Sequence, residues 1–572
     1  MPLNVRGAVP LALVTALVLA FSVAAYDDPA GDGPLFRSDD PIWLDGDKAF
    51  DAGGARPQEL GQIYDFLENT FASVADRRNI PAVNVNTLDE VPDSSWFTNR
   101  LGRQMMSDAE VVRGPDRVDR LEIDEWTIVA GKSGGLQPGF QVVRTGDPSK
   151  QRYQIEFDPP DNPEIATGAE IIGTAIYHAL GYNVVDVYLT ELDVAKLRIA
   201  PTATIRDRAG RRRPFNRHDL DDVLRRAARL PSGRYRAIVS RFADGEPMGN
   251  FRYYGTRPDD PNDIYPHEHR RELRASRVFA AWLNHDDSRA NNTLDMMEGE
   301  PGQQFIRHYM FDFGSILGSA TVGPNAPRSG HEYLYEPDVS RKTLLTFGLW
   351  APAWARRSVP STPAAVGRFT ADGFEPRSWR PEYPNAAFDN MRPDDAFWGA
   401  RRVAGFSDEM LRQIVEKAEY SDPRATDYLV ETIKERRDRI ARVWLTGVTP
   451  IIAPRLSAEG WLSFENAAVE AGAAAPPARY TVSWSRFDNL RRRHEEVGGQ
   501  VELETRRTRA PAAVLDSQYV CATLHAAHPD YPQWMAPVRV YFRRDGDDWT
   551  TVGFFREDPG AEHGAFGERA LP

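Results

Sequence analysis

The chain has 572 residues, which is too many for a single hydrophobic core, so several domains are expected. Hydrophobic residues make up 41% of the sequence, and the formal net charge is -13 with a pI near 5.5. A chain this acidic has no overall affinity for nucleic acid or for an anionic membrane surface, so we expect no nucleic-acid partner. Cys521 is the only cysteine, so no intrachain disulfide can form and packing must hold the fold.

Residues 1–25 have the pattern of a signal peptide. Arg6 precedes an apolar run over residues 8–21, and small residues at 23–25 suit a cleavage position. The run is shorter than the ~20 residues that a membrane-spanning helix needs. We therefore expect export to the periplasm or the extracellular space, with no stable transmembrane anchor after cleavage.

Residues 26–120 are predicted to be an N-terminal extension. They are rich in turns and hold one helix candidate, at residues 60–67. The segment 91–99 is mostly polar and contains two adjacent aromatic residues, Trp96 and Phe97. It could serve as a binding loop, but we favour packing of these aromatic rings onto the neighbouring domain.

The sequence pattern changes to that of strands after residue 121. Alternating apolar residues predict three antiparallel strands, at residues 126–129, 140–143 and 153–157. A helix with one apolar stripe follows and ends at Gly181. Its start is predicted either at Asn162-Pro163 or at a capping box that begins with Thr167.

The connection between the first two strands is rich in glycine. Gly134, Gly135 and Gly139 would let backbone amides approach phosphate oxygens. The segment is not a P-loop, because Trp126 stands where that motif requires its first glycine.

From about residue 266 to 450 the chain is predicted to be mainly helical, and the remainder after residue 450 is predicted to be rich in strands. A helix from about residue 266 to 283 leads to His285. Further elements are strands at 293–296 and 305–311, helices at 407–418 and 426–445, and a hairpin over 538–555.

The most informative motif lies between His285 and Gly314. His285, Asp287 and Asn292 form the pattern H-x-D-x-x-x-x-N, and D-F-G follows at Asp312. Phosphoryl transfer needs a carboxylate that orients the acceptor hydroxyl and a metal held by an aspartate and an amide oxygen. Asp287 is the candidate base, and Asn292 and Asp312 are candidate ligands of Mg²⁺ or Mn²⁺. Arg289 stands where a cation can reach the transferred group.

These motifs make residues 121–450 resemble the protein kinase-like superfamily. The resemblance is to atypical members, the HipA-type and spore-coat kinases, and to exported bacterial proteins of similar layout. It implies an α+β, bilobal fold, with an N-lobe at 121–245, a helical C-lobe at 246–450, and ATP or another nucleotide between them. The N-terminal extension and a small β-rich accessory domain at 451–572 would flank the lobes.

One departure from the family pattern concerns the lysine that normally lies on the third strand. Glu156 stands at that position, and Lys132 is the nearest substitute, with Lys150 a poorer one. Glu170 and Glu164 compete for the role of the helix glutamate that pairs with the lysine.

Three functions remain open. The first is a kinase-like phosphotransferase that passes a phosphoryl or nucleotidyl group to an unknown protein or small-molecule acceptor. The second, favoured by Glu156, is a catalytically inactive pseudokinase that acts as a binding scaffold at the cell envelope. The third, a metal-dependent hydrolase built on residues 285–287, leaves the D-F-G motif unexplained.

Overall fold

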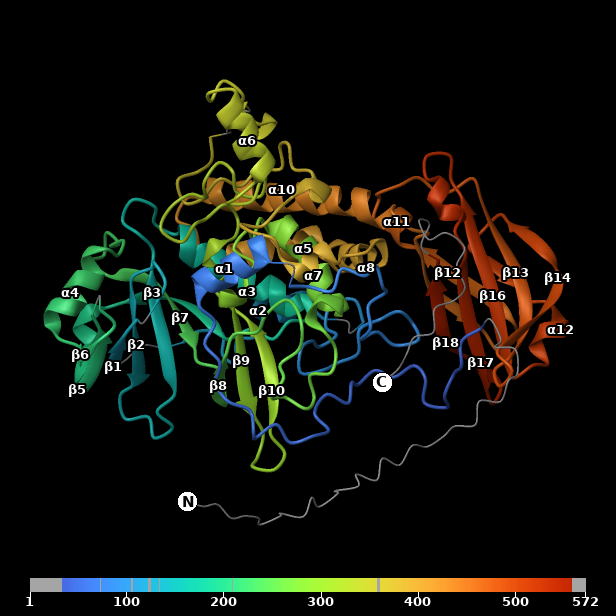
Figure 1. Ribbon diagram of the computed structural model, residues 1–572, viewed down its shortest axis with the longest axis horizontal. Coiled ribbons are helices and arrows are strands. Elements are labelled where there is room, and N and C mark those ends of the chain that lie inside the picture. The colour runs from blue at the N-terminus through green and yellow to red at the C-terminus, as the bar shows by residue number, and fades with distance from the viewer. Residues whose placement is uncertain are drawn as a thin grey trace, which may run out of the picture.

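The structure is a computed structural model that describes residues 33–557, apart from residues 73, 104–105, 122–124, 133, 208 and 357–360. The predicted signal peptide lies outside the described residues. Three parts follow one another along the molecule: a β-rich part with β1 to β7, a helical part with α5, α8 and α10, and a second β-rich part with β12 to β18 (Figure 1). The expected mixed α+β fold is confirmed. Among the residues described, no helix is long and apolar enough to cross a membrane.

The first part contains a seven-stranded sheet in the order β4-β7-β3-β2-β1-β5-β6. Its central strands β1, β2 and β3 pair antiparallel, as predicted. β5 and β6 were not predicted, because their side chains are mostly exposed and give no alternating apolar pattern. The strands are β1 (Trp126–Gly131), β2 (Gly139–Arg144), β3 (Arg152–Phe157), β4 (Val187–Leu192), β5 (Leu197–Arg206), β6 (Arg212–Pro214) and β7 (Tyr235–Arg241). The short helix α4 (Arg217–Arg225) follows β6.

Helix α3 (Ile165–Leu180) joins this sheet to the helical part, and all of its residues except His178 are buried. Its start differs from both predicted caps. Asp158, just beyond β3, caps it, because Oδ1 accepts hydrogen bonds from the backbone amides of Ala166 and Thr167 at 2.9 Å each. The predicted end at Gly181 is confirmed by a left-handed φ of 117°.

The helical part packs around large buried side chains such as Trp282 and Trp398. The helix predicted from residue 266 begins later, because a 3₁₀ turn (His267–His269) precedes α5. The helices are α5 (Arg271–Leu283), α6 (Pro337–Leu345), α7 (Ala386–Asp389), α8 (Pro393–Ala404), α9 (Asp408–Glu416) and α10 (Pro423–Ile440), which continues as a π-helical turn (Ala441–Leu445). A small sheet in the order β10-β9-β8 lies beside them, formed by β8 (Glu246–Gly249), β9 (Thr293–Glu298) and β10 (Phe305–Met310).

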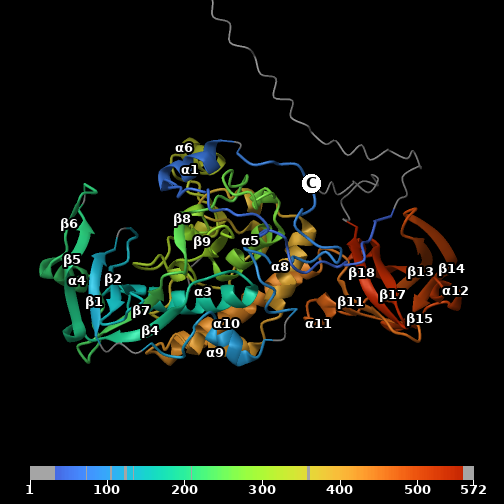
Figure 2. The same cartoon turned by 90° about the horizontal axis from the view of Figure 1, so that it is seen from below.

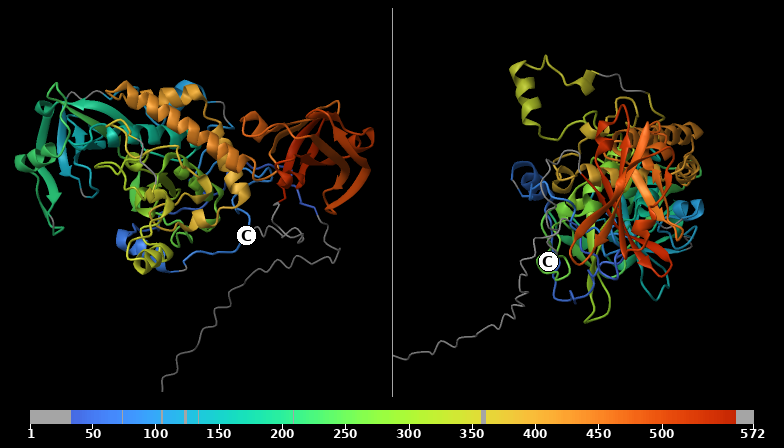
Figure 3. Two further views of the ribbon diagram at one scale, coloured as in Figure 1. Left: turned by 90° about the horizontal axis from the view of Figure 1, so that it is seen from above. Right: turned by 90° about the vertical axis from the view of Figure 1, so that its right-hand side faces the viewer.

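The second β-rich part contains a five-stranded sheet, β14-β13-β16-β17-β18, and a three-stranded sheet, β11-β12-β15. The hairpin predicted over residues 538–555 is confirmed as β17 and β18. Views from below and from above place these sheets at the far end of the molecule from β1 and β2 (Figures 2 and 3). The elements are β11 (Ile451–Leu456), β12 (Trp461–Asn466), α11 (Ala467–Glu470), β13 (Arg479–Asp488), β14 (Arg493–Leu503), β15 (Arg507–Arg509), α12 (Ala512–Leu515), β16 (Tyr519–Ala527), β17 (Val538–Asp545) and β18 (Asp548–Arg556).

The described part of the N-terminal extension contacts both the C-terminal sheets and the helical part. Phe36 is buried among aromatic rings of the five-stranded sheet, including Phe487 and Tyr541. Further along, Trp96 stacks on His308 with ring centroids 3.5 Å apart, and Phe97 is fully buried. The predicted packing role of these two aromatics is therefore confirmed. The extension also contains α1 (Gln62–Phe71) and α2 (Asp108–Arg113).

Candidate functional site

The β9–β10 hairpin brings together the two predicted metal ligands. Asn292 comes directly before β9 and Asp312 follows β10, and the strands pair with Thr293 opposite Met310. The amide of Phe311 donates a hydrogen bond of 3.3 Å to the carbonyl of Asn292. Backbone pairing therefore places Asn292 opposite Phe311, the residue just before Asp312, although the whole hairpin separates them in the sequence.

The Asp312 carboxyl lies in an environment that suits a divalent cation. Burial, and then the neighbouring Glu156, raise its pKa to about 6, and the cations Lys132 and Arg289 oppose this rise. None of the residues that the structure describes donates a hydrogen bond to this carboxylate. A carboxylate and an amide oxygen are suitable ligands for Mg²⁺, which often takes its remaining ligands from phosphates and water. Within the described ranges, no group of three or more His, Cys, Asp or Glu residues could hold a metal by itself.

Asp287, the predicted base, is held on two sides. The side-chain amide of Asn292 donates a hydrogen bond of 2.9 Å to its carbonyl, and Arg289 Nε lies 2.6 Å from its Oδ1. Burial raises the pKa of Asp287 to about 7, against the lowering effect of Arg289. A base with a pKa near the working pH is well matched to accept a proton from a hydroxyl.

Glu170 lies at the site and Glu164 does not. The backbone amides of Phe313 and Gly314 donate hydrogen bonds to the Glu170 carboxylate, and burial raises its pKa well above the usual range. Glu164 precedes α3 and accepts a hydrogen bond of 3.0 Å from the Ser421 amide instead. Of the two alternatives, Glu170 is therefore the residue that contacts the D-F-G segment.

Lys132 lies at the start of the glycine-rich segment and forms an ion pair with Glu156. Lys132 directly follows β1, and its ammonium also donates a hydrogen bond of 3.3 Å to the Gln137 carbonyl. Gly139 pairs with Glu156 across the sheet, and a Cβ at Gly139 would lie 2.3 Å from the Ile155 carbonyl oxygen. Gly135 has a φ of 77° that favours glycine, while a Cβ at Gly134 would meet nothing within 4 Å. The acid on β3 thus faces a lysine from β1.

Aromatic rings that were not anticipated from the sequence join α3 to His285 and to the D-F-G segment. Tyr177 stacks on Phe313 with centroids 4.4 Å apart, and its hydroxyl lies 3.0 Å from Nδ1 of His285. Burial lowers the pKa of His285 to about 3, so this ring is neutral near pH 7. A Cβ at Gly173 would lie 2.5 Å from Cβ of Phe313, so the glycine makes room for the stack. The sequence signal that could have predicted this contact is the pair Gly173 and Tyr177, which lie four residues apart and therefore on one face of the helix.

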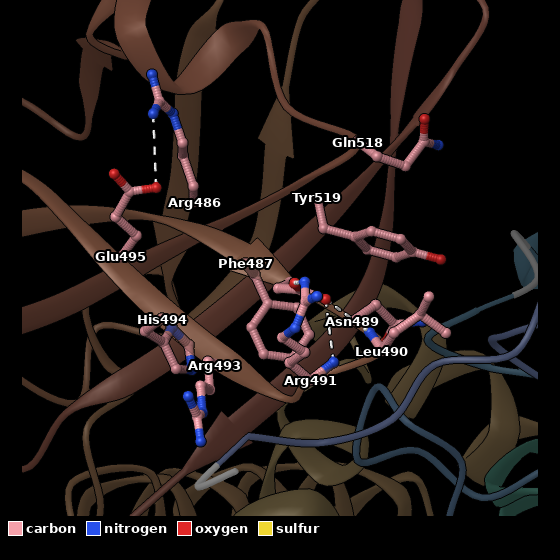
Figure 4. A pocket seen from close by; sticks show the side chains of 11 residues that line it. Arg486, Phe487, Asn489, Leu490, Arg491, Arg493, His494, Glu495, Gln518 and Tyr519 are labelled. Carbon is pink, nitrogen blue, oxygen red and sulfur yellow. Dashed lines mark hydrogen bonds and ion pairs between the residues drawn. The ribbon is translucent and has the colours of Figure 1, made fainter. Parts of the chain in front are cut away.

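Two surface hollows lie away from these residues. One, of about 730 Å³, is on the C-terminal sheet at the end of the β13–β14 hairpin, where Leu490, Arg493 and Tyr519 line it (Figure 4). The other, of about 210 Å³, lies between the end of α1 and α7, beside Asn69 and Pro384. Neither is lined by a candidate site residue.

No protein-family model matches this sequence, and no curated protein matches it. Among solved structures, the chain is similar to the crystal structure of a Helicobacter pylori proinflammatory kinase, CtkA. The sequences are 13% identical, the match covers 54% of this chain and 92% of the other, and the TM-score is 0.28. The likeness to a kinase is therefore distant, and the functional argument depends on the geometry of the site.

Proposed function

We propose that this protein is an exported, kinase-like phosphotransferase that binds ATP or another nucleotide together with Mg²⁺ or Mn²⁺. The observation that carries the proposal is the convergence of two groups of residues. Lys132 and Glu170 come from the first β-rich part and α3, and Asp287, Asn292 and Asp312 come from the helical part. This set matches the parts that phosphoryl transfer needs.

Each side chain has a defined task under this proposal. Asn292 and Asp312 would hold the divalent cation, which when bound neutralises phosphate charge. Lys132 would contact phosphate oxygens, and the glycine-rich segment would let its backbone approach them. Asp287 would accept the proton of the acceptor hydroxyl as the phosphoryl or nucleotidyl group is transferred. The acceptor is a protein or a small molecule with such a hydroxyl.

Binding of ATP with Mg²⁺ or Mn²⁺, measured by calorimetry, tests the proposal. The unmodified protein is expected to bind the nucleotide in a metal-dependent way, and Asp312→Ala should abolish the metal dependence. Asp338→Ala is a matched control, because Asp338 lies on α6 with its side chain 76% exposed. A protein that binds no nucleotide with either metal would contradict the proposal.

A second candidate function is a catalytically inactive scaffold at the cell envelope, and Glu156 is the observation that favours it. A carboxylate on β3 repels a triphosphate, and its ion pair with Lys132 occupies the better of the two lysines that could replace the expected one. The scaffold predicts that Asp312→Ala leaves the cellular phenotype unchanged, whereas the phosphotransferase predicts its loss.

A further inference from the structure

The guanidinium of Arg289 is surrounded by three acceptors, one from its own loop and two from distant segments of the chain. Its Nε contacts Asp287 Oδ1 at 2.6 Å, and its Nη1 donates a hydrogen bond of 2.8 Å to Glu382 Oε2, in the segment after α6. With its amide oxygen turned toward Arg289, Gln62 on α1 accepts hydrogen bonds from Nη1 at 3.0 Å and Nη2 at 3.1 Å. Arg289 therefore points at its protein partners, which differs from the phosphate contact expected from the sequence.

Helix α1 contacts the site through two polar side chains, Gln62 and Asp65. Ordinary surface helices bury their apolar stripe, but in α1 the buried residue is Asp65, which accepts a hydrogen bond from the Tyr383 hydroxyl. Ile63 is 77% exposed and Leu67 is 45% exposed. Phe66 is half-buried and packs on Tyr383, so polar contacts with the site act together with this one aromatic contact to place α1.

Two further contacts join α1, or the residue just before it, to the segment that carries Arg289 and to the segment that carries Glu382. The side-chain amide of Asn291 donates a hydrogen bond of 3.4 Å to the carbonyl of Leu60, just before α1. Tyr383, the partner of Asp65, directly follows Glu382, and its ring lies 5.6 Å from that of Phe66. The segment that carries Arg289 and the segment that carries Glu382 are thus each joined by a further contact to α1 or to the residues just before it.

We infer that Gln62 and Glu382 are positioning residues, which fix Arg289 and through it the Asp287 carboxylate, so that the N-terminal extension is a working part of the catalytic centre. The inference rests on the proposed phosphotransferase function. The base must lie within hydrogen-bonding reach of the acceptor hydroxyl, and a misplaced carboxylate slows transfer without weakening nucleotide binding. Loss of either acceptor should therefore lower kcat and leave the KM for ATP unchanged.

The test is the steady-state turnover of ATP with Mg²⁺ by the full chain, with water or the protein itself as acceptor. Gln62→Met and Glu382→Met are each expected to lower kcat about tenfold, with the KM for ATP within about twofold of the original. Gln62→Glu and Glu382→Gln each keep an acceptor oxygen and should retain most of the rate, which shows that the loss comes from the missing acceptor and not from misfolding. Gln58→Met and Glu336→Met, which remove contacts to Asp259 and Arg380, are matched controls and should leave kcat unchanged.

A double-mutant cycle distinguishes positioning through Arg289 from a general effect on folding. In an Arg289→Met background, Glu382→Met should cause no further loss of kcat, because its partner is already gone. Rates of Gln62→Met and Glu382→Met within twofold of the original, or additive losses in the cycle, would overturn the inference while nucleotide binding still stands. ATP binding without turnover by the unmodified protein would overturn both the inference and the catalytic assignment. Absence of ATP binding would overturn the proposed function itself.

Discussion

The substitution Lys132→Met tests whether Lys132 contacts the phosphates of a bound nucleotide or only neutralises the charge of Glu156. The two side chains form an ion pair and are 21% and 17% exposed. A hydrogen bond between a charged donor and a phosphate contributes about 1.5–3 kcal/mol. Since about 1.4 kcal/mol corresponds to a tenfold change in Kd, Lys132→Met should weaken binding of ATP with Mg²⁺ by about 10- to 150-fold.

The partner change, Glu156→Gln, should have the opposite effect. Two like charges about 6 Å apart repel by about 3 kcal/mol at an effective dielectric constant near 20, and partial exposure reduces this value. Removal of the carboxylate also frees Lys132 for phosphate. We expect Glu156→Gln to tighten ATP binding by about tenfold.

Calorimetry on both single variants and the double variant completes the test, with Lys150→Met as the control. Lys150 lies in an exposed turn after β2, where the loss of a lysine should not affect Kd. If Lys132 contacts phosphate, the double variant binds ATP more weakly than Glu156→Gln alone. If the two bind equally well, Lys132 only neutralises Glu156, and the assignment of Lys132 to the phosphates is refuted.

Four further predictions concern stability, the site and pH. Phe36→Ala should lower the free energy of unfolding by about 3–5 kcal/mol in denaturant titrations, because its ring is buried among aromatics of the C-terminal sheet; an unchanged midpoint would contradict this. Gly173→Val should displace Phe313, which costs about 1–3 kcal/mol of stability and lowers ATP turnover; normal turnover at an unchanged melting temperature would be the contrary result. Cys521 is buried with its pKa raised to about 12, so a thiol reagent should label it only after unfolding, and rapid labelling of the native protein would disprove this. Burial raises the pKa of Asp286 and Asp287 to about 7 in the folded state. The folded state therefore binds more protons than the unfolded chain between pH 4 and 7. The free energy of unfolding should fall as the pH rises across this range, by up to ~1.4 kcal/mol per pH unit for each group, and Asp286→Asn should reduce the slope.

The parts of the site that depend on local spacing could be predicted from the sequence. Asp287, Asn292 and Asp312 lie in one short stretch, and the pairing of β9 with β10 follows from its strand pattern. The choice between Glu164 and Glu170 could not be made, because it depends on how α3 begins. That start is set by Asp158, a residue of the preceding segment that has no helical pattern of its own.

Contacts between segments far apart in the chain could not be predicted. The pairing of Lys132 with Glu156 depends on the register between β2 and β3, and a shift of one residue would turn Glu156 to the other face. Gln62 and Glu382 meet at Arg289 although no local pattern in either segment indicates it. α1 was predicted from apolar spacing, yet the structure exposes Ile63 and Leu67 of that apolar face and buries Asp65, so spacing identified the helix but not its buried side.

The burial of Phe36 in the C-terminal sheet has a consequence for biosynthesis. Its backbone amide donates to Asn489, 453 positions later in the sequence, and its ring lies 6.5 Å from that of Phe555, near the end of the described chain. A ribosome makes the strands that contact Phe36 more than 450 residues after Phe36 itself, so this segment has no partner while the intervening chain is being made. The segment around Phe36 can therefore dock only after the strands β16 to β18 have been made. A chain that stops before residue 451 would leave Phe36 exposed to water and would present quality-control proteases with an unpaired segment.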